Sequence, residues 1–126
     1  MNNVETIAIV PTVFDVGGDT FSKLSTLHDW NDGGSRLFGV SGHVKTPGVY
    51  ECAVGLTLRE LIYDLGGGIL GDGKLMAVIP GGSSCPVHLA DEIVDVPNND
   101  KFAPYNGKSF LDLPLGVDTY RGIASM

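Results

Sequence analysis

The chain contains little of what nucleic-acid-binding and membrane proteins depend on. Its 126 residues include eight Lys and Arg against fifteen Asp and Glu, for a formal net charge of −7. The basic residues are scattered, which excludes non-specific binding to the phosphates of nucleic acids. No apolar run approaches the roughly 20 residues that a membrane-spanning helix needs. The first residues, MNNVET, lack a basic segment, so we expect no signal peptide.

Cysteine and histidine are also scarce. The two cysteines, Cys52 and Cys85, lie far apart and do not have the CxxC spacing of metal or cluster sites. We therefore expect two free thiols in a reducing compartment. His28, His43 and His88 each stand alone beside turn residues and form no set of ligands. The residues thus predict no metal site and no catalytic group in this chain.

Glycine and proline, by contrast, are frequent. Eighteen Gly and seven Pro predict tight turns and short elements rather than long helices. The 43% apolar content is sufficient for one modest core. At this length we expect one domain, with room for pieces of neighbouring domains.

A helix is predicted over residues 2–16. Asn2 and Asn3 are favoured N-cap types, and Glu5 suits the positive end of the helix dipole. Pro11 should break or kink this helix. Apolar residues occupy most of its sides, so we expect it to be buried against a larger body. A second, weaker helix is predicted over residues 20–27.

The middle of the chain predicts a strand, a strand, a helix and a strand. Two strands, residues 37–41 and 48–52, are joined by a turn rich in Pro and Gly. Thr57 and Glu60 form a capping box that starts a helix, and glycines 66–68 end it. The apolar run 75–79 is consistent with a strand buried on both faces. This order predicts an α+β fold with a β-grasp (ubiquitin-like) core.

Two further motifs have weak functional interpretations. The turn Pro80-Gly81-Gly82-Ser83-Ser84 could bind an anion through converging backbone N–H groups, but it lacks the lysine of a phosphate loop. A tight turn or an interface loop is the alternative. An acidic patch further on is interpreted as a solvated face rather than a general acid and base; it comprises Asp91, Glu92, Asp95 and Asp100.

The segment 37–86 resembles the SLBB (soluble-ligand-binding β-grasp) domain, through SGHVKTPGVYE, LTLRELI and the glycine-rich helix end. The later stretch AVIPGGSSCPV, with ADE at 90–92, resembles more specifically the NADH- and FMN-binding flavoprotein subunit of respiratory complex I. Two flanking motifs agree with that family. NNVET at residues 2–6 matches the end of its FMN-binding domain, and the stretch from Asp112 to Met126 matches the linker toward its cluster-bearing domain.

The resemblance implies a domain organisation and a set of cofactor contacts. Residues 1–34 would end the FMN- and NADH-binding domain, 35–93 would be the SLBB domain, and 94–126 would be an inserted loop and linker. Asn2, Asn3 and Thr6 would contact FMN in the complete subunit. That subunit would hold FMN and a 4Fe-4S cluster, whereas we expect no cofactor and no activity in this chain alone, because the flavin loop and cluster cysteines are absent from it.

The resemblance also implies partners and a location. The expected partners are other domains of the same subunit and neighbouring complex I subunits, with no nucleic acid and no direct membrane insertion. The expected location is cytoplasmic, peripheral to the inner membrane, within an NADH-quinone oxidoreductase. In this role the chain would be a structural and interface domain. The alternative is a stand-alone soluble-ligand-binding module, whose pocket would be formed by the β-grasp edge and the turn from Gly81 to Ser84. A periplasmic export-type module is disfavoured by NNVET and by the expected absence of a signal peptide.

Overall fold

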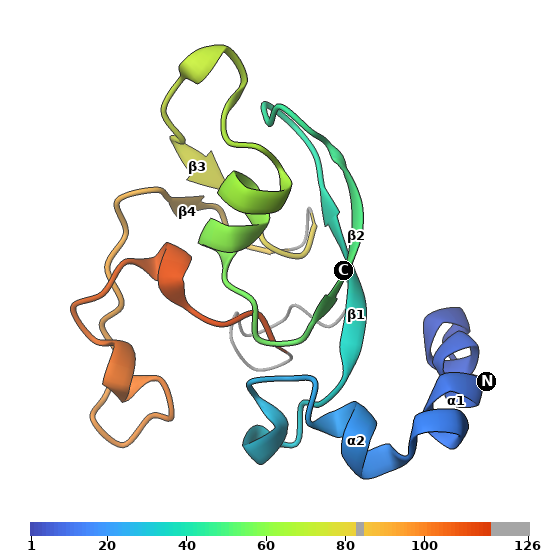
Figure 1. Cartoon of the computed structure of the whole chain (residues 1–126). Helices are drawn as coiled ribbons and strands as arrows, with labels where there is room; N and C mark the ends of the chain where they lie inside the picture. The colour runs from blue at the N-terminus through green and yellow to red at the C-terminus, as the bar shows by residue number, and fades with distance from the viewer. Residues whose placement is uncertain (83–84, 117–126) are drawn as a thin grey trace.

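The computed structural model describes residues 1–82 and 85–116. Its fold is mixed α+β, as predicted (Figure 1). The longer elements are α1 (Val4–Val16), α2 (Gly18–Ser22), β1 (Ser35–Val40), β2 (Gly48–Ala53), β3 (Ala77–Val78) and β4 (His88–Leu89). Between them the described residues form short helical segments: η1 (His28–Trp30), η2 (Glu60–Leu65), η3 (Leu70–Asp72), η4 (Ala103–Tyr105) and η5 (Phe110–Asp112).

The predicted hairpin is present as β1 and β2. The two strands pair antiparallel from Ser35 opposite Ala53 to Val40 opposite Gly48. Phe38 points to the inner face and is 2% exposed. Tyr50, its partner across the ladder, packs beside the same core. The hairpin therefore supplies one wall of the hydrophobic core.

The predicted capping box begins the helix that covers this wall. The Thr57 hydroxyl accepts from the Glu60 backbone N–H at 3.1 Å, and a Glu60 carboxylate oxygen accepts from the Thr57 N–H at 2.7 Å. The N–H of Gly66 then donates to the carbonyl of Leu61 at 2.9 Å, a π-helical spacing. The predicted glycine stop is also confirmed, because Gly67 and Gly68 adopt φ of 71° and 82°.

The core is closed by the last part of the described chain. Leu115 is 0% exposed, and its backbone accepts from Gly55 at 2.9 Å and donates to Leu56 at 2.7 Å. Residues from the first part of the segment 94–126, expected as an inserted loop and linker, also pack into the core rather than forming only an external loop. The buried side chains that they contribute are Val94, Phe102, Phe110 and Leu111.

The expected third strand differs from its prediction. β3 is two residues long and pairs with β4, whereas the described residues show no pairing between β3 and β1. Met76 is 83% exposed and Ile79 is 49% exposed, so the run 75–79 is not buried on both faces. The reason lies in the tertiary structure. Burial on both faces requires other segments to pack on each face of the run, whereas β4 only pairs with one edge of β3.

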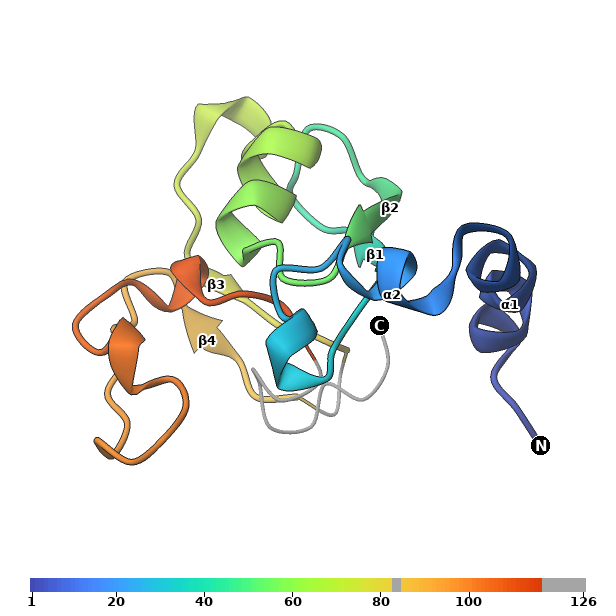
Figure 2. The same ribbon diagram turned by 60° about the horizontal axis from the view of Figure 1, so that its bottom comes forward.

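The N-terminal helices differ in part as well. α1 starts after Asn3 as predicted and continues through Pro11 to Val16, so the helix does not break there. The alternative prediction, a kink at Pro11, stays a prediction. α1 has no buried residue and lies at the edge of the molecule in both views (Figures 1 and 2).

The second predicted helix ends early, at Ser22. The buried hydroxyl of Ser25 donates to the Asp32 carbonyl at 2.7 Å and accepts from the Leu27 N–H at 2.9 Å. These bonds offer the backbone an alternative to the helical pattern, which explains why residues 23–27 leave the helix.

Replacing Leu61 or Ile62 by Ala should lower the free energy of unfolding by about 2–5 kcal/mol each, because each leaves a cavity in the core. Urea titration with detection by circular dichroism measures the loss. Leu70→Ala is the matched control, since Leu70 is largely exposed. A loss at Leu61 and Ile62 no larger than the loss at Leu70 would contradict this core.

Replacing Thr57 by Val should lower the free energy of unfolding by about 0.5–2 kcal/mol, because the Glu60 N–H loses its side-chain acceptor. Thr57→Ser keeps the hydroxyl and is the control. Equal stability of the Val and Ser variants in thermal melts would show that the capping box has no energetic role.

Candidate functional site

The three residues expected to contact FMN lie together at the start of α1. The side-chain oxygen of Asn3 accepts from the N–H groups of Glu5, at 2.8 Å, and Thr6, at 3.4 Å. Asn2, Asn3 and Thr6 are all exposed. Asn3 is therefore the N-cap of the helix, and its side-chain NH2 remains available as a donor. The flavin role of these residues stays a prediction.

α1 is attached to the rest of the chain through the edge of β1. A carboxylate oxygen of Glu5 accepts from the backbone N–H of Leu37 at 2.8 Å. A shallow groove of about 340 Å³ runs between α1 and the start of the hairpin, lined in part by Val10, Phe14 and Phe21. Several large apolar side chains of α1 face solvent: Val4, Ile7, Val10, Phe14 and Val16. This helix thus presents an apolar surface that the described residues leave uncovered.

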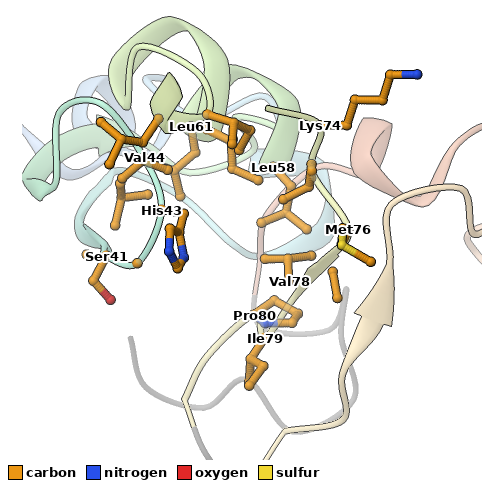
Figure 3. Close-up of a pocket in the computed structure, with 18 of the residues that line it drawn as sticks. Ser41, His43, Val44, Leu58, Leu61, Lys74, Met76, Val78, Ile79 and Pro80 are labelled. Atoms are coloured by element: carbon orange, nitrogen blue, oxygen red, sulfur yellow. The ribbon is translucent and has the colours of Figure 1, made fainter. Parts of the chain in front are cut away.

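A larger cavity, of about 640 Å³, opens beside the other end of β1. Its walls come from the end of the hairpin, from η2 and the residues just before it, and from residues 74–81 (Figure 3). Leu58, Leu61 and Val78 supply apolar surface. The size and apolar lining are those of small-molecule pockets.

The cavity exists because β3 pairs with β4 and not with β1. His88 of β4 stacks on Phe110 at a ring-centroid distance of 3.9 Å, which fixes β4 on the core. Glu92 accepts from His88 Nδ1 at 3.0 Å and from the Leu89 N–H at 3.3 Å. Because β3 is held by β4, the space between β3 and the edge of β1 stays open.

The polar side chains of the cavity come from two separate segments. His43 and Ser41 lie in the turn between β1 and β2, near one another (Figure 3). Lys74 lies on the opposite side of the cavity, and its side chain extends away from both of them. Within the described part of the chain, the side chains of Ser41, His43 and Lys74 have no hydrogen-bond or ion-pair partner.

The glycine-serine turn lies partly outside the described residues. Gly81 and Gly82 adopt φ of 99° and 103°, and the Cys85 N–H donates to the Gly82 carbonyl at 3.0 Å. Ser83 and Ser84 are not among the described residues, so the predicted anion-binding turn stays a prediction. Pro80 and Gly81 do line the cavity.

The acidic patch has structural partners. Glu92 bonds to His88 and Leu89, as above, and Asp100 Oδ1 accepts from the Phe102 N–H at 2.9 Å. The interpretation of the patch as a solvated face stays a prediction. Among the residues that the structure covers, no group of three or more His, Cys, Asp or Glu could hold a metal ion.

The clear pKa shifts lie outside the cavity. Burial raises the pKa of the Cys52 thiol, and the negative charge of Glu51 raises it further. Cys52 is therefore a poorer nucleophile than a free thiol, because less of it is thiolate. A hydrogen bond from Lys45, at 2.6 Å, lowers the pKa of Asp72. Neither shift indicates a catalytic group.

Sequence reasoning foresaw only part of the cavity. The alternative of a ligand-binding module placed a pocket at the β-grasp edge and the glycine-serine turn, and Gly81 is indeed at its wall. It missed His43, Lys74 and the contribution of η2. The sequence offered little to indicate that these residues lie near one cavity. His43 is an isolated histidine in a turn, Lys74 is a single lysine before an apolar run, and no sequence motif contains both.

Comparisons with known proteins agree with the sequence pattern. Residues 36–101 match the family model described as the SLBB domain. The chain is 47% identical over 98 residues to the F subunit of NADH-quinone oxidoreductase of Rhodobacter capsulatus, which covers 75% of this chain and 22% of the relative. The F subunit of Mycobacterium tuberculosis is 45% identical and that of Aquifex aeolicus 42% identical, each over 97 residues, with 77% of this chain and 21% of the relative covered.

The chain therefore spans about a fifth of the length of these relatives. The family model covers more than half of the chain, and the part that it matches contains all of the hairpin except Ser35, the capped helix and β3. A β-grasp-like core is consistent with that match. The chain therefore belongs to the SLBB domain family.

Proposed function

We propose that this chain is the SLBB middle domain of an NADH-quinone oxidoreductase flavoprotein subunit and serves there as spacer and interface. The observation that carries the proposal is the identity of 42–47% to the F subunits of that enzyme over about three quarters of the chain. The complete subunit would take hydride from NADH onto FMN and pass electrons to an iron–sulfur cluster. In this division of work the SLBB domain holds the two cofactor domains apart.

The uncovered apolar helix supports the interface role. α1 has no buried residue, and burying apolar surface is the main favourable term in domain association. Residues 1–34 would belong to the end of the flavin domain, residues 35–93 to the SLBB domain and residues 94–126 to an insertion and linker. Asn2, Asn3 and Thr6 would then face the flavin from the start of α1.

A spacer needs rigid attachment at both ends, and the contacts of the chain are suited to it. Glu5 ties α1 to β1 at Leu37, and Leu115 is tied to the loop at Gly55 and Leu56 by two backbone hydrogen bonds. The first attachment is on the hairpin, and the second is on the loop that joins the hairpin to η2. A fixed separation would benefit electron transfer, which requires short and constant distances between cofactors.

The proposal includes partners and a place in the cell. The partners are the flanking domains of the subunit and neighbouring complex I subunits, and the place is the cytoplasmic side, peripheral to the inner membrane. In the part of the chain that the structure covers, no helix is long and apolar enough to cross a membrane. Quinone chemistry and proton pumping would belong to other subunits.

A stand-alone ligand-binding module is the second candidate. The cavity of about 640 Å³ favours it, because pockets of this size and lining hold small molecules. The extent of the reading frame distinguishes the two. Continuation into a glycine-rich flavin loop upstream and cluster cysteines downstream would support the subunit; termination at both ends would support the module.

The isolated chain should not bind FMN at micromolar concentration. Contacts from Asn2, Asn3 and Thr6 alone do not offset the loss of translational and rotational freedom on association. Quenching of flavin fluorescence during titration measures binding, with the complete flavoprotein subunit as the positive control. Half-saturation at micromolar FMN would contradict the proposed division of roles.

Replacing Phe14 by Ser should change the stability of the isolated chain by less than about 0.5 kcal/mol, because this side chain is 86% exposed. In the complete subunit the same change should reduce flavin retention and assembly, since the apolar surface would be buried there. Leu24→Ser, at another exposed apolar position outside α1, is the matched control. Equal flavin retention and assembly of the Phe14 variant and the control would argue against an α1 interface.

A further inference from the structure

Two stretches late in the described chain pair antiparallel around a short loop. The Phe110 N–H donates to the Glu92 carbonyl at 2.9 Å, and the Val94 N–H donates to the Lys108 carbonyl at 3.0 Å. The Gly107 N–H donates to the Val94 carbonyl at 2.9 Å, so Gly107 and Lys108 both face Val94. With φ of 80° at Gly107, this is a β-bulge that starts on a glycine.

Asn106 extends this pairing with its side chain instead of its backbone. Its Oδ1 accepts from the Val96 N–H at 2.9 Å, and its Nδ2 donates to the Val96 carbonyl at 2.9 Å. The side-chain amide thus makes the reciprocal pair of bonds that two backbone residues exchange in an antiparallel ladder. This contact, which we call the Asn106 clasp, closes the loop of residues 97–105, which contains η4 (Figure 1).

The loop that the clasp closes supplies part of the core. Phe102 is 8% exposed and packs edge-on against Trp30, with 5.4 Å between the ring centroids. The ammonium group of Lys101 lies over the same Trp30 ring, 5.2 Å from its centroid. Because the clasp fixes the base of the loop, a lasting change at Asn106 would loosen the segment that holds Phe102 in the core.

The sequence at the clasp has a chemical reactivity of its own. Asn106 is the one asparagine of the chain that glycine follows, and glycine has no side chain to hinder attack by its backbone nitrogen. In deamidation that nitrogen loses its proton and bonds to Asn106 Cγ, and ammonia leaves from Cγ. Water then opens the succinimide ring. Breaking the N–Cγ bond gives aspartate, and breaking the bond from the nitrogen to the backbone carbonyl carbon gives isoaspartate.

The folded geometry holds the reacting atoms out of position. Ring closure requires Asn106 Cβ and the Gly107 nitrogen to be nearly eclipsed about the Cα–C bond, whereas ψ of 134° at Asn106 keeps them far from that arrangement. The Gly107 proton that must leave is held by the Val94 carbonyl, and the Asn106 amide is held by Val96. A reaction that needs a near-attack geometry is slow when the structure fixes the atoms elsewhere.

We propose that Asn106 is a deamidation site controlled by opening of the clasp. In the folded chain the reaction requires the loop 97–105 to open first, and the product cannot restore the clasp. A carboxylate still accepts from the Val96 N–H but has no proton for the Val96 carbonyl, and isoaspartate adds a methylene to the backbone. Deamidation is therefore a one-way loosening of this loop. The proposal goes beyond the spacer role, which does not require it.

Trypsin makes the site easy to follow, because Lys101 and Lys108 flank it and residues 102–108 are released as one peptide. The 126-residue chain is incubated at neutral pH, folded or unfolded in guanidinium chloride, and the aspartate and isoaspartate forms of this peptide are measured by liquid chromatography and mass spectrometry. The folded chain should convert at least about tenfold more slowly than the unfolded chain, because only the open fraction reacts. A synthetic peptide of residues 102–108 gives the rate without protection.

A variant that weakens the anchor of the loop tests the gating in the folded chain. Phe102→Leu keeps an apolar side chain in the core but fills it less well, and it should speed conversion about fivefold. Phe14→Leu, at a phenylalanine that is 86% exposed and outside the loop, is the matched control. Hydrogen exchange of the Gly107 amide, measured by NMR, should rise by a similar factor, because it requires the same opening.

A second pair of variants tests the effect of the product. Asn106→Asp reproduces the aspartate form, and Asn99→Asp adds the same charge at an exposed position of the same loop. Amide exchange within the loop should be about fivefold faster in the first variant than in the second, because only the first loses a bond to the Val96 carbonyl.

Several results would overturn the proposal. Equal conversion of the folded and unfolded chains would show that the clasp gives no protection, and no conversion of the unfolded chain would show that the site is unreactive. Equal rates in the Phe102 and Phe14 variants would exclude gating by the loop. Equal loop exchange in the two aspartate variants would show that the product loosens nothing. FMN binding and subunit assembly are separate measurements, so failure here leaves the spacer role unaffected.

Discussion

The burial of one face of η2 and of Leu58 just before it is the constraint on which the rest of the structure depends. Leu58, Leu61 and Ile62 pack in the same core as Phe38 of the hairpin and Leu115 near the end of the described chain. Each is almost fully buried, so the chain cannot lose one of these contacts without leaving a cavity. The hairpin, the capped helix and the segment 110–115 are held together through this single cluster.

The two surfaces of functional interest follow from that core. Val78 packs against the core, but the stacking of His88 on Phe110 holds the paired strand β4 away from β1. The end of β1 near Val40 is therefore left beside a cavity. Toward the other end of β1, Glu5 bonds to Leu37 and positions α1 with its apolar side chains exposed. One strand thus has a cavity at its end and a helix contact near its beginning.

Membership of the SLBB family and similarity to a flavoprotein subunit concern the same residues but answer different questions. The family match accounts for the hairpin and the capped helix. The similar proteins are much longer, and in a protein of that kind we propose that a further domain covers the exposed helix α1. The apolar cavity beside β1 is not required by the spacer role, since a spacer needs only rigidity.

The sequence by itself determined the features whose physics is local. A capping box acts across three residues, glycine alone adopts positive φ cheaply, and Asn3 needs only its own helix to cap, so these could be predicted. The tertiary structure decided the rest. Pairing of β3 with β4 and burial of Phe110 in the core depend on residues outside the local segment. The cavity is of this second kind, because His43, Leu61 and Lys74 share no sequence pattern and meet only when the core brings three segments together.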